Sequence, residues 1–475
     1  MNRREFLGAL SAGAAALLPR GMAFQAHAAG ESNAARKPNF VLLVADDLTW
    51  HDIGCYGGRN VKTPNIDSLA RDGMKFNLAF TAASMCTPCR TMLYTGLFPV
   101  KNGAHPNHSS AKAGTRSIVH YLHDLGYKVV LNGKGDVRPT ESFPFDRGNL
   151  EGLLRSDKPF CFIMGFSRPH PPWKADYRPG FDPQKIELPP YVLDTPETRE
   201  ALCRYYAEVA LLDAEVGRHL DQVRQAGKQD NTLVLFFSEQ GSMMPAGKWT
   251  CYEPGIHAGV LARWPARVKP GSACDQIVQY TDVAPTLVEA AGGSVPKGLD
   301  GKSFLDLLDG KTEGHWTYAY AVQTTRGIIA ATPGGYAVRA IRDKRYKLIL
   351  NLQHESAFCD HVTGVDPEGF WKSWVAAAEK PDPKARKLVE RYRHRPPVEF
   401  YDLEKDPWEM SNLADDPQHK DVIEKMRREL LAWMQDQGDK GAQTENPTEK
   451  AGPAKKAGKK KQKDGGVDEN ASPSL

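Results

Sequence analysis

The chain of 475 residues is long enough for one large domain and a smaller one. Its composition is that of a globular protein, with 41% hydrophobic and 25% charged residues and no apolar run long enough to span a bilayer. The formal charge is +4, of which the Lys-rich end from residue 440 contributes +3 and the first 28 residues +2, leaving −1 for the body. A nearly neutral body argues against general nucleic-acid binding, which needs a basic face.

The first 29 residues contain the three parts of a twin-arginine export signal in the expected order. Arg3 and Arg4 come first, residues 8–18 form an apolar core, and the sequence AHA at 26–28 resembles a cleavage site. The core is too short for a membrane anchor. We therefore expect export of the folded protein through the twin-arginine translocon, to the periplasm or the outside of the cell.

Continuous apolar runs predict strands that are covered on both faces, at residues 39–45, 127–131, 160–164 and 232–237. Helices are predicted between them, at residues 63–73, 115–125 and 196–226. Each strand ends abruptly in a polar cluster. This alternation predicts an α/β domain in which helices cover both faces of a large, mostly parallel sheet.

The polar clusters contain the side chains that could form a site. The carboxyl ends of parallel strands lie along one edge of a sheet, where ligands of such sheets bind. Side chains far apart in sequence can therefore meet there, namely Asp46, Asp47, Lys134, His170, Glu239 and Gln240.

From about residue 335 the pattern changes to half-exposed strands. Residues 337–342 and 345–350 predict a hairpin, and a strand at 398–403 precedes a helix at 420–435. We predict a smaller C-terminal α+β domain at 335–437, built on an antiparallel sheet and packed on the larger domain at 36–334. From residue 438 to 475 the Lys-rich sequence lacks apolar periodicity, which predicts a disordered tail.

The segment CTPCR at residues 86–90 permits two interpretations. As a C-x-x-C pair, Cys86 and Cys89 would form a thioredoxin-like redox site, which needs a small βαβ domain and little else. As C-x-P-x-R, the segment needs acidic and amide oxygens and several cations nearby, and the strand ends supply them. The eight cysteines have no regular spacing, so we expect mostly buried free thiols, with one or two disulfides after export as the alternative.

With the Asp pair before it and Thr95-Gly96 after it, this segment resembles the motif of the type I sulfatases of the alkaline phosphatase superfamily. The resemblance extends over residues 38–437 and is strongest to bacterial relatives of heparan N-sulfatase (sulfamidase). Besides the segment itself, the matching stretches are residues 39–47, 63–73, 133–134, 169–170, 238–241, 248–255 and 400–414.

The resemblance implies that a formylglycine-generating enzyme oxidises Cys86 to Cα-formylglycine (3-oxoalanine). The hydrated aldehyde has two hydroxyls on one carbon. One hydroxyl attacks sulfur and expels the alcohol or amine. Deprotonation of the second then breaks the carbon–oxygen bond and releases sulfate, whereas a serine would remain as a stable sulfate ester.

The resemblance also implies a divalent cation bound by Asp46, Asp47, the modified Cys86, Glu239 and Gln240. The family has Asp-Asn at the last two positions, so both side chains are one methylene longer here. A set made only of oxygen ligands favours calcium, with magnesium as the alternative, over zinc.

The remaining site residues are implied in the same way. Arg90 would hydrogen-bond the formylglycine and steady the metal ligands, and Lys134 and Lys248 would hold sulfate oxygens. His170 matches the histidine that binds sulfate or protonates the leaving group. The family commonly has a histidine two residues after the lysine; here that residue is Asp136, which we predict to be the base for sulfate release.

The predicted function is that of an exported, calcium-dependent sulfatase acting on a sulfated glycan, with Arg326 binding a substrate carboxylate such as that of a uronic acid. The sugar and the choice between N-sulfo and O-sulfo linkage stay open. Two alternatives remain. One is a phosphomonoesterase or phosphonate hydrolase on the same scaffold. The other is a non-catalytic glycan-binding relative, because a second histidine that is common in the family is Ser167 here.

Overall fold

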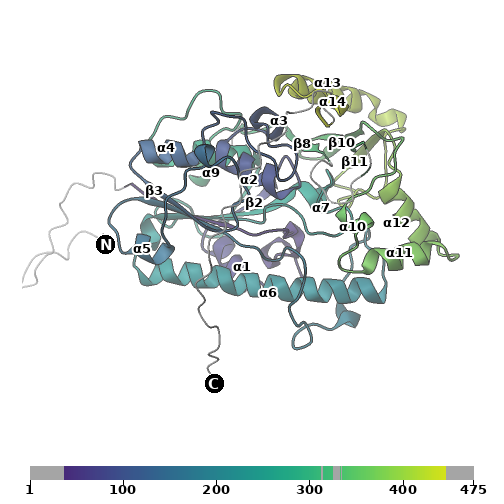
Figure 1. Ribbon diagram of the computed structural model, residues 1–475, viewed down its shortest axis with the longest axis horizontal. Helices are drawn as coiled ribbons and strands as arrows, with labels where there is room; N and C mark the ends of the chain where they lie inside the picture. Colours follow the sequence, from purple (N-terminus) through teal and green to yellow (C-terminus); the bar gives the residue numbers. More distant parts are fainter. Residues whose placement is uncertain (1–36, 312–313, 325–331, 333, 446–475) are drawn as a thin grey trace, which may run out of the picture. The chain divides into compact units, whose positions relative to one another are not determined.

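The computed structural model describes residues 37–311, 314–324, 332 and 334–445, and a seven-stranded sheet forms its centre (Figure 1). The strand order is β3-β4-β1-β5-β6-β2-β7, in which only β6 runs antiparallel to its neighbours. The strands are β1 Asn39–Val44, β2 Met74–Phe80, β3 Lys128–Gly133, β4 Phe160–Gly165, β5 Thr232–Phe237, β6 His257–Arg263 and β7 Ser272–Gln279. The predicted α/β class and mostly parallel sheet are confirmed.

Alternating side chains of the central strand β1 enter two separate apolar cores. Val41 and Leu43 pack into the core that contains α1 and α6, whereas Phe40 and Leu42 pack into the core that contains α2, α4 and α8. Burial on both faces explains why this strand is a continuous apolar run. The helices of this part are α1 Pro64–Arg71, α2 Cys86–Thr95, α3 Pro99–Asn102, α4 Ile118–Asp124, α5 Leu150–Leu154, α6 Pro196–Gln225, α7 Glu253–Ile256, α8 Val283–Ala290 and α9 Leu305–Leu308.

Helix α6 has 30 residues and runs along one face of the sheet (Figure 1). The side chain of Thr195 accepts a hydrogen bond from the backbone N–H of Thr198, and Pro196 occupies the first turn, so both common start signals are present. The predicted helix at 196–226 is therefore confirmed.

A second sheet has the strand order β11-β10-β9-β8 and is entirely antiparallel. The predicted hairpin corresponds to β9 and β10, and the predicted final helix to α13. The sheet begins with β8, before residue 335, and no helix is predicted at 351–397, where the structure has three. The elements are β8 Ala319–Gln323, β9 Val338–Arg342, β10 Tyr346–Asn351, β11 Val398–Asp402, α10 His361–Gly364, α11 Phe370–Ala378, α12 Pro383–Arg393, α13 Lys420–Asp436 and α14 Ala442–Glu445.

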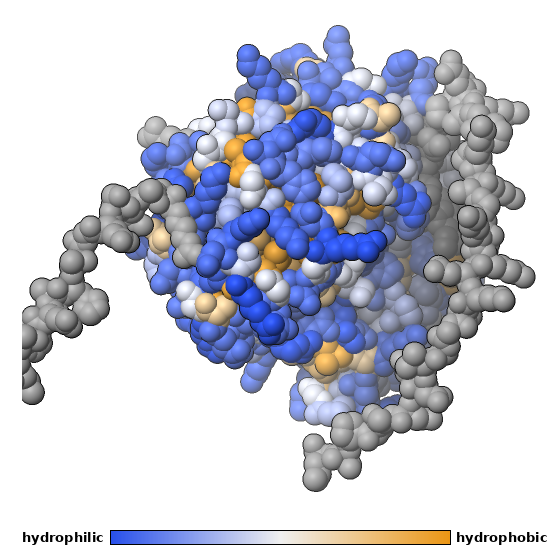
Figure 2. All heavy atoms as spheres, turned by 60° about the vertical axis from the view of Figure 1, so that its left-hand side comes forward, coloured by the Kyte–Doolittle hydropathy of each residue, from blue (hydrophilic) through white to orange (hydrophobic). Residues whose placement is uncertain are grey.

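Residues 438–445, assigned above to the tail, belong to the described fold. Asp439 is buried and pairs through both carboxylate oxygens with the buried Arg339 of β9. The rest of the tail and the export signal lie outside the described residues. Within the described part, no helix is both long and apolar enough to span a membrane. The described surface on the face in Figure 2 is mostly hydrophilic, with small separate apolar patches.

Candidate active site

Four predicted polar clusters follow strands whose carboxyl ends lie at the same edge of the large sheet. Asp46 and Asp47 follow β1, Lys134 follows β3, His170 lies in the loop after β4, and Gln240 follows β5. Helix α2 begins at this edge with Cys86, which is its first residue. Parallel strand order thus brings together residues separated by almost 200 positions.

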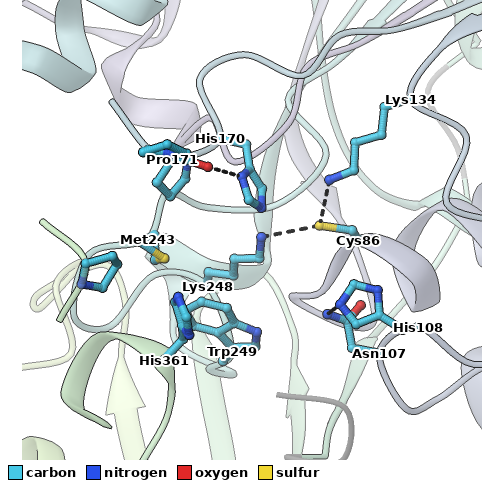
Figure 3. Close-up of a pocket in the computed structure, with 12 residues that line it drawn as sticks. Cys86, Asn107, His108, Lys134, His170, Pro171, Met243, Lys248, Trp249 and His361 are labelled. Atoms are coloured by element: carbon cyan, nitrogen blue, oxygen red, sulfur yellow. Dashed lines mark hydrogen bonds between the residues drawn. The ribbon is translucent and has the colours of Figure 1, made fainter. Parts of the chain in front are cut away.

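The Cys86 thiol lies at the centre of this group. Its Sγ atom is 3.3 Å from Lys248 Nζ, 3.4 Å from Lys134 Nζ, 3.5 Å from Asp46 Oδ1 and 3.7 Å from Gln240 Nε2. Both ammonium contacts are drawn in Figure 3. The thiol is 2% exposed, so a group at this position reacts inside the protein and not on its surface.

Each of the two aspartates is paired with one lysine. Lys134 Nζ donates to Asp46 Oδ2 at 2.5 Å, and Lys248 Nζ lies 2.7 Å from Asp47 Oδ1. The Gln240 amide nitrogen also donates to Asp47 Oδ1, at 2.6 Å. Both carboxylates are fully buried, and buried charges of this kind require such partners.

Glu239 is held by Arg90 through two hydrogen bonds. Arg90 Nε donates to Glu239 Oε1 at 2.8 Å, and Nη2 donates to Oε2 at 2.7 Å. The third nitrogen, Nη1, donates to the backbone carbonyl of Lys134 at 2.7 Å. Arg90 therefore connects β3 and β5 at the site, and both oxygens of Glu239 are already engaged by a cation.

Gly165, the last residue of β4, allows this close approach. A Cβ atom at Gly165 would lie 1.9 Å from the Lys134 carbonyl oxygen and 2.8 Å from Arg90 Nη1. Any larger residue would push the end of β4 away from the backbone after β3 and from the Arg90 side chain of α2.

The electrostatics of the group follow from burial and pairing. Burial by itself raises the pKa of Asp46, but the nearby cations Lys134, Arg90 and Lys248 more than offset this and hold its pKa well below the usual range. Burial lowers the pKa of Lys134, but the neighbouring Cys86 and Asp46 outweigh it and the pKa is raised. The pKa of Lys248 is likewise raised, chiefly by Asp47 against the effect of burial.

Burial raises the pKa of the Cys86 thiol well above its ordinary value, and the Asp46 charge adds to the rise. A thiol of this kind is neutral at neutral pH and is a poor nucleophile. Cys89 is also buried, its Sγ contacts the Glu239 carbonyl at 3.6 Å, and no disulfide joins it to Cys86. A redox C-x-x-C pair requires an accessible thiol with a lowered pKa, so this geometry does not support the thioredoxin-like interpretation.

The donor set fits a hard divalent cation. The buried Gln240 Oε1 has no hydrogen-bond partner, although its amide nitrogen is held by Asp47. Ligand atoms of Asp46, Cys86 and His170 all lie within 4.8 Å of one another. Carboxylate and amide oxygens are the ligands that calcium and magnesium prefer. Of the predicted oxygen ligands, Glu239 fits least directly, because Arg90 binds both of its oxygens.

His170 approaches the group from the loop after β4. Its Nδ1 lies 2.6 Å from the Pro171 carbonyl, which can only accept, so Nδ1 carries a proton. The other ring nitrogen, Nε2, lies 3.7 Å from Asp47 Oδ2. In the neutral ring Nε2 therefore has a lone pair and can take up a proton. In the protonated ring the same atom can donate that proton.

Cys86, Lys134, Lys248 and His170 line a cavity of about 410 Å³ (Figure 3). The other lining residues were not predicted: Asn107, His108, Pro171, Pro172, Met243, Trp249, His361 and Pro367. Pro171 and Trp249 had a sequence signal, because each directly follows a predicted site residue, His170 or Lys248. His361 and Pro367 belong to the segment between β10 and β11, for which no helix was predicted.

Asp136, another predicted site residue, is not among the described residues that line this cavity. Asp136 Oδ2 lies 3.2 Å from Lys134 Nζ, so Asp136 contacts the site through that lysine. Arg326 lies outside the described residues. The proton-accepting role of Asp136 and the carboxylate-binding role of Arg326 stay predictions.

Backbone strain is concentrated around the cavity. Among the described residues, eight non-glycine residues have positive φ, and five of them belong to the site or adjoin it: Asp47, His108, Asp136, Glu239 and Trp249. Such conformations persist only where the surrounding structure enforces them, and they cluster at functional sites.

Comparison with known proteins identifies relatives over most of the chain. The sulfatase family model matches residues 38–150 and 147–294, and the model described as "N-sulphoglucosamine sulphohydrolase, C-terminal" matches residues 246–369 and 382–436. An ulvan-active sulfatase of Formosa agariphila is 33% identical over 85% of this chain and 81% of its own length. Human N-sulphoglucosamine sulphohydrolase is 27% identical over 84% of this chain and 90% of its own length.

Solved structures with the same fold are more distant in sequence. A putative sulfatase from Bacteroides fragilis superposes with a TM-score of 0.68 at 20% identity, covering 88% of this chain and 99% of that one. The phosphonate monoester hydrolase of Agrobacterium radiobacter superposes with a TM-score of 0.64 at 19% identity, covering 84% and 96%. At these identities the likeness concerns the fold alone.

Proposed function

Because the chain belongs to the sulfatase family, we propose that it hydrolyses a sulfate ester or a sulfamate of a saccharide at the cavity above Cys86. The single observation that carries the proposal is the surrounding of the Cys86 Sγ atom. Two ammonium groups, a carboxylate and an amide lie within 3.7 Å of it, at the bottom of an open cavity. This arrangement fits a tetrahedral anion above a reactive group.

The nucleophile is proposed to derive from Cys86 by oxidation to formylglycine, introduced by a formylglycine-generating enzyme. The buried neutral thiol is poorly suited to attack sulfur by itself. Formylglycine supplies a geminal diol, whose hydroxyl is the nucleophile. The position of Cys86 at the first turn of α2 favours a developing negative charge there.

The divalent cation is proposed to be calcium, with magnesium as the alternative. Asp46, Asp47 and the unpartnered Gln240 Oε1 are the oxygens best suited to hold it. Glu239 completes the set through its remaining lone pairs or acts by orienting Arg90. The bound cation supplies Lewis acidity, which polarises a sulfate oxygen and favours the ionised nucleophile.

Lys134 and Lys248 are proposed to bind the sulfate oxygens. Both ammonium groups lie beside Cys86, and the raised pKa values keep them charged. They therefore stabilise negative charge that develops on these oxygens. Arg90 fixes the position of Lys134 by donating to its carbonyl.

His170 is proposed to be the proton donor to the leaving group. Its Nδ1 is fixed by the Pro171 carbonyl, so Nε2 is the nitrogen that exchanges protons with the substrate. Asp136 is proposed as the base for sulfate release. Its contact with Lys134 holds its carboxylate next to the lysine that is proposed to bind the sulfate.

The substrate class is proposed from the relatives, whose names specify ulvan and N-sulphoglucosamine. Both are sulfated saccharides. We also propose export through the twin-arginine translocon, on the basis of the first 29 residues.

The decisive experiment co-expresses the chain with a formylglycine-generating enzyme and compares turnover of 4-nitrophenyl sulfate with that of 4-nitrophenyl phosphate. We expect sulfate turnover to dominate and the mass of the Cys86 peptide to indicate the aldehyde. Dominant phosphate turnover would instead favour the phosphonate hydrolase alternative, which the fold match to such an enzyme keeps open. An unmodified thiol with saccharide binding but no turnover would favour the non-catalytic alternative.

A further inference from the structure

One wall of the cavity contains a buried hydrogen-bond donor without an acceptor. Trp249 is 5% exposed, and its indole Nε1–H has no partner. Buried indole N–H groups usually have one, and an exception needs an explanation. Trp264, Trp371 and Trp433 also have unpartnered indole nitrogens, but none of these three lines the cavity.

Trp249 is held rigidly in an unfavourable conformation. Its φ is +66°, which is a rare value for a bulky residue. The backbone N–H donates to the Ser84 carbonyl at 2.9 Å, just before Cys86, and the ring of His361 packs against the indole at 5.9 Å. The protein thus fixes both the backbone and the ring of Trp249 beside the reactive position.

The indole nitrogen points toward the side of the cavity where Asn107 and His108 lie (Figure 3). The backbone N–H of Thr87 lies 3.4 Å from Asn107 Oδ1, which directs the Asn107 amide nitrogen toward His108 Nε2, 3.2 Å away. That ring nitrogen then accepts, so the proton of the neutral His108 ring is on Nδ1. His108 therefore adds a second uncharged donor.

The surroundings of these donors suit a sugar ring. Met243, Pro171 and Pro172 give the cavity apolar walls, whereas the cations Lys134 and Lys248 are paired with Asp46 and Asp47 near Cys86. Uncharged donors next to apolar surface are the usual combination for saccharide recognition, since they match oxygen atoms on an otherwise apolar ring face.

We propose that Trp249 and His108 form a subsite that binds an oxygen atom of the saccharide next to its sulfated position. This inference rests on the proposed function, because the sulfate must bind near Cys86 for the sugar to reach this wall. Trp249 and His108 would thus select for the saccharide, and the charged residues would act on the sulfate.

The test compares two substrates in the formylglycine-containing enzyme. One is 4-nitrophenyl sulfate, which has no saccharide; the other is N-sulfoglucosamine or a sulfated ulvan oligosaccharide, whichever the wild type hydrolyses faster. Trp249→Phe removes the N–H but keeps an aromatic ring. We expect the ratio of kcat/KM for the saccharide to kcat/KM for 4-nitrophenyl sulfate to fall by about tenfold, because one donor to a substrate oxygen is lost.

Trp264→Phe is the matched control, since this buried tryptophan also has an unpartnered indole nitrogen but does not line the cavity. Its substrate ratio should equal that of the wild type. Trp249→His, which restores a ring N–H, should recover part of the lost ratio. An unchanged ratio in Trp249→Phe overturns the proposal.

If Trp249→Phe does not fold, the exposed residue His108 provides the second test. His108→Ala should lower the same ratio by about threefold or more, as expected for a partly exposed donor. An unchanged ratio in His108→Ala would then overturn the subsite. Failure of the proposed function is a different result, because the wild type would then hydrolyse neither sulfate substrate.

Discussion

Two clusters of buried charges illustrate how differently this protein uses ionisable residues. The site cluster surrounds Cys86, and an inter-sheet cluster joins the two sheets through Glu253, His257, Arg342, Lys347 and Glu409. Lys347 of β10 lies 3.2 Å from Glu253 and 2.8 Å from Glu409. Both clusters contain carboxylates and cations that are almost wholly buried.

The clusters differ in what they leave accessible. The inter-sheet residues do not line the cavity. The site cluster, in contrast, opens into this cavity of about 410 Å³ and includes the Gln240 amide oxygen, which has no hydrogen-bond partner. Buried ion pairs are therefore not a mark of catalysis by themselves. The open cavity distinguishes the site, because the inter-sheet cluster also has buried groups without a hydrogen-bond partner, on Arg342, and a residue with positive φ, Glu409.

The largest expected effect is that of Cys86→Ala. It should lower kcat for 4-nitrophenyl sulfate by roughly 10³-fold or more, because the proposed nucleophile is lost. Cys89→Ala, three residues later in the same helix, is the matched control and should retain activity within about tenfold. Equal losses in both variants would restore the C-x-x-C interpretation.

In the inter-sheet cluster a substitution should affect stability instead. Lys347→Met leaves Glu253 and Glu409 without their shared ammonium, which should lower the free energy of unfolding by about 3–5 kcal/mol. Denaturant titration measures this, and the folded variant should keep its activity. The exposed Lys344→Met should change stability by less than about 0.5 kcal/mol. A loss of activity without a loss of stability in Lys347→Met would contradict the distinction between the clusters.

Calcium should stabilise the site cluster and not the inter-sheet cluster. At a hundredfold excess over its dissociation constant, a bound ion raises the free energy of unfolding by about 2.7 kcal/mol. Gln240→Leu should weaken the calcium affinity by about tenfold, since an amide oxygen ligand is removed. Gln323→Leu is the control, because its buried Oε1 also has no hydrogen-bond partner but lies at the end of β8. Thermal unfolding with and without calcium tests this, and an equal calcium response in both variants would exclude Gln240 as a ligand.

The smallest expected effect is the pH dependence of stability, which has opposite signs in the two clusters. Burial raises the pKa of Glu409 from its ordinary value to about 7. The native state therefore keeps a proton on Glu409 at pH values where the unfolded chain has lost it. The stability that this proton contributes is fully present below the ordinary Glu pKa and is lost as the pH rises through about 7. Asp46, whose pKa is lowered, contributes stability above the ordinary Asp pKa and loses it as the pH falls further.

Glu409→Gln, which cannot titrate, should remove a decline on the order of 2 kcal/mol between pH 5 and pH 8. Denaturant titrations across this range measure the slope. A slope identical to that of the wild type would show that Glu409 is ionised throughout.

The sequence by itself determined the local elements and the edge at which the site forms. The apolar runs of β1, β4 and β5 are buried on both faces, and this burial is what makes them continuous. Their polar ends had to lie at one edge once the strands were parallel, so the meeting of Asp46 and Gln240 at Cys86 could be predicted from residues far apart.

Only the tertiary structure decided which groups pair and what forms the cavity walls. Arg90 of α2 reaches both Glu239 after β5 and the Lys134 carbonyl after β3, where Gly165 leaves room for it, and no local pattern encodes these distances. His108, Trp249 and His361 reach one cavity from three separate segments. Side-chain periodicity reports burial along one element, whereas a pair or a pocket depends on the packing between elements, which a single sequence does not specify.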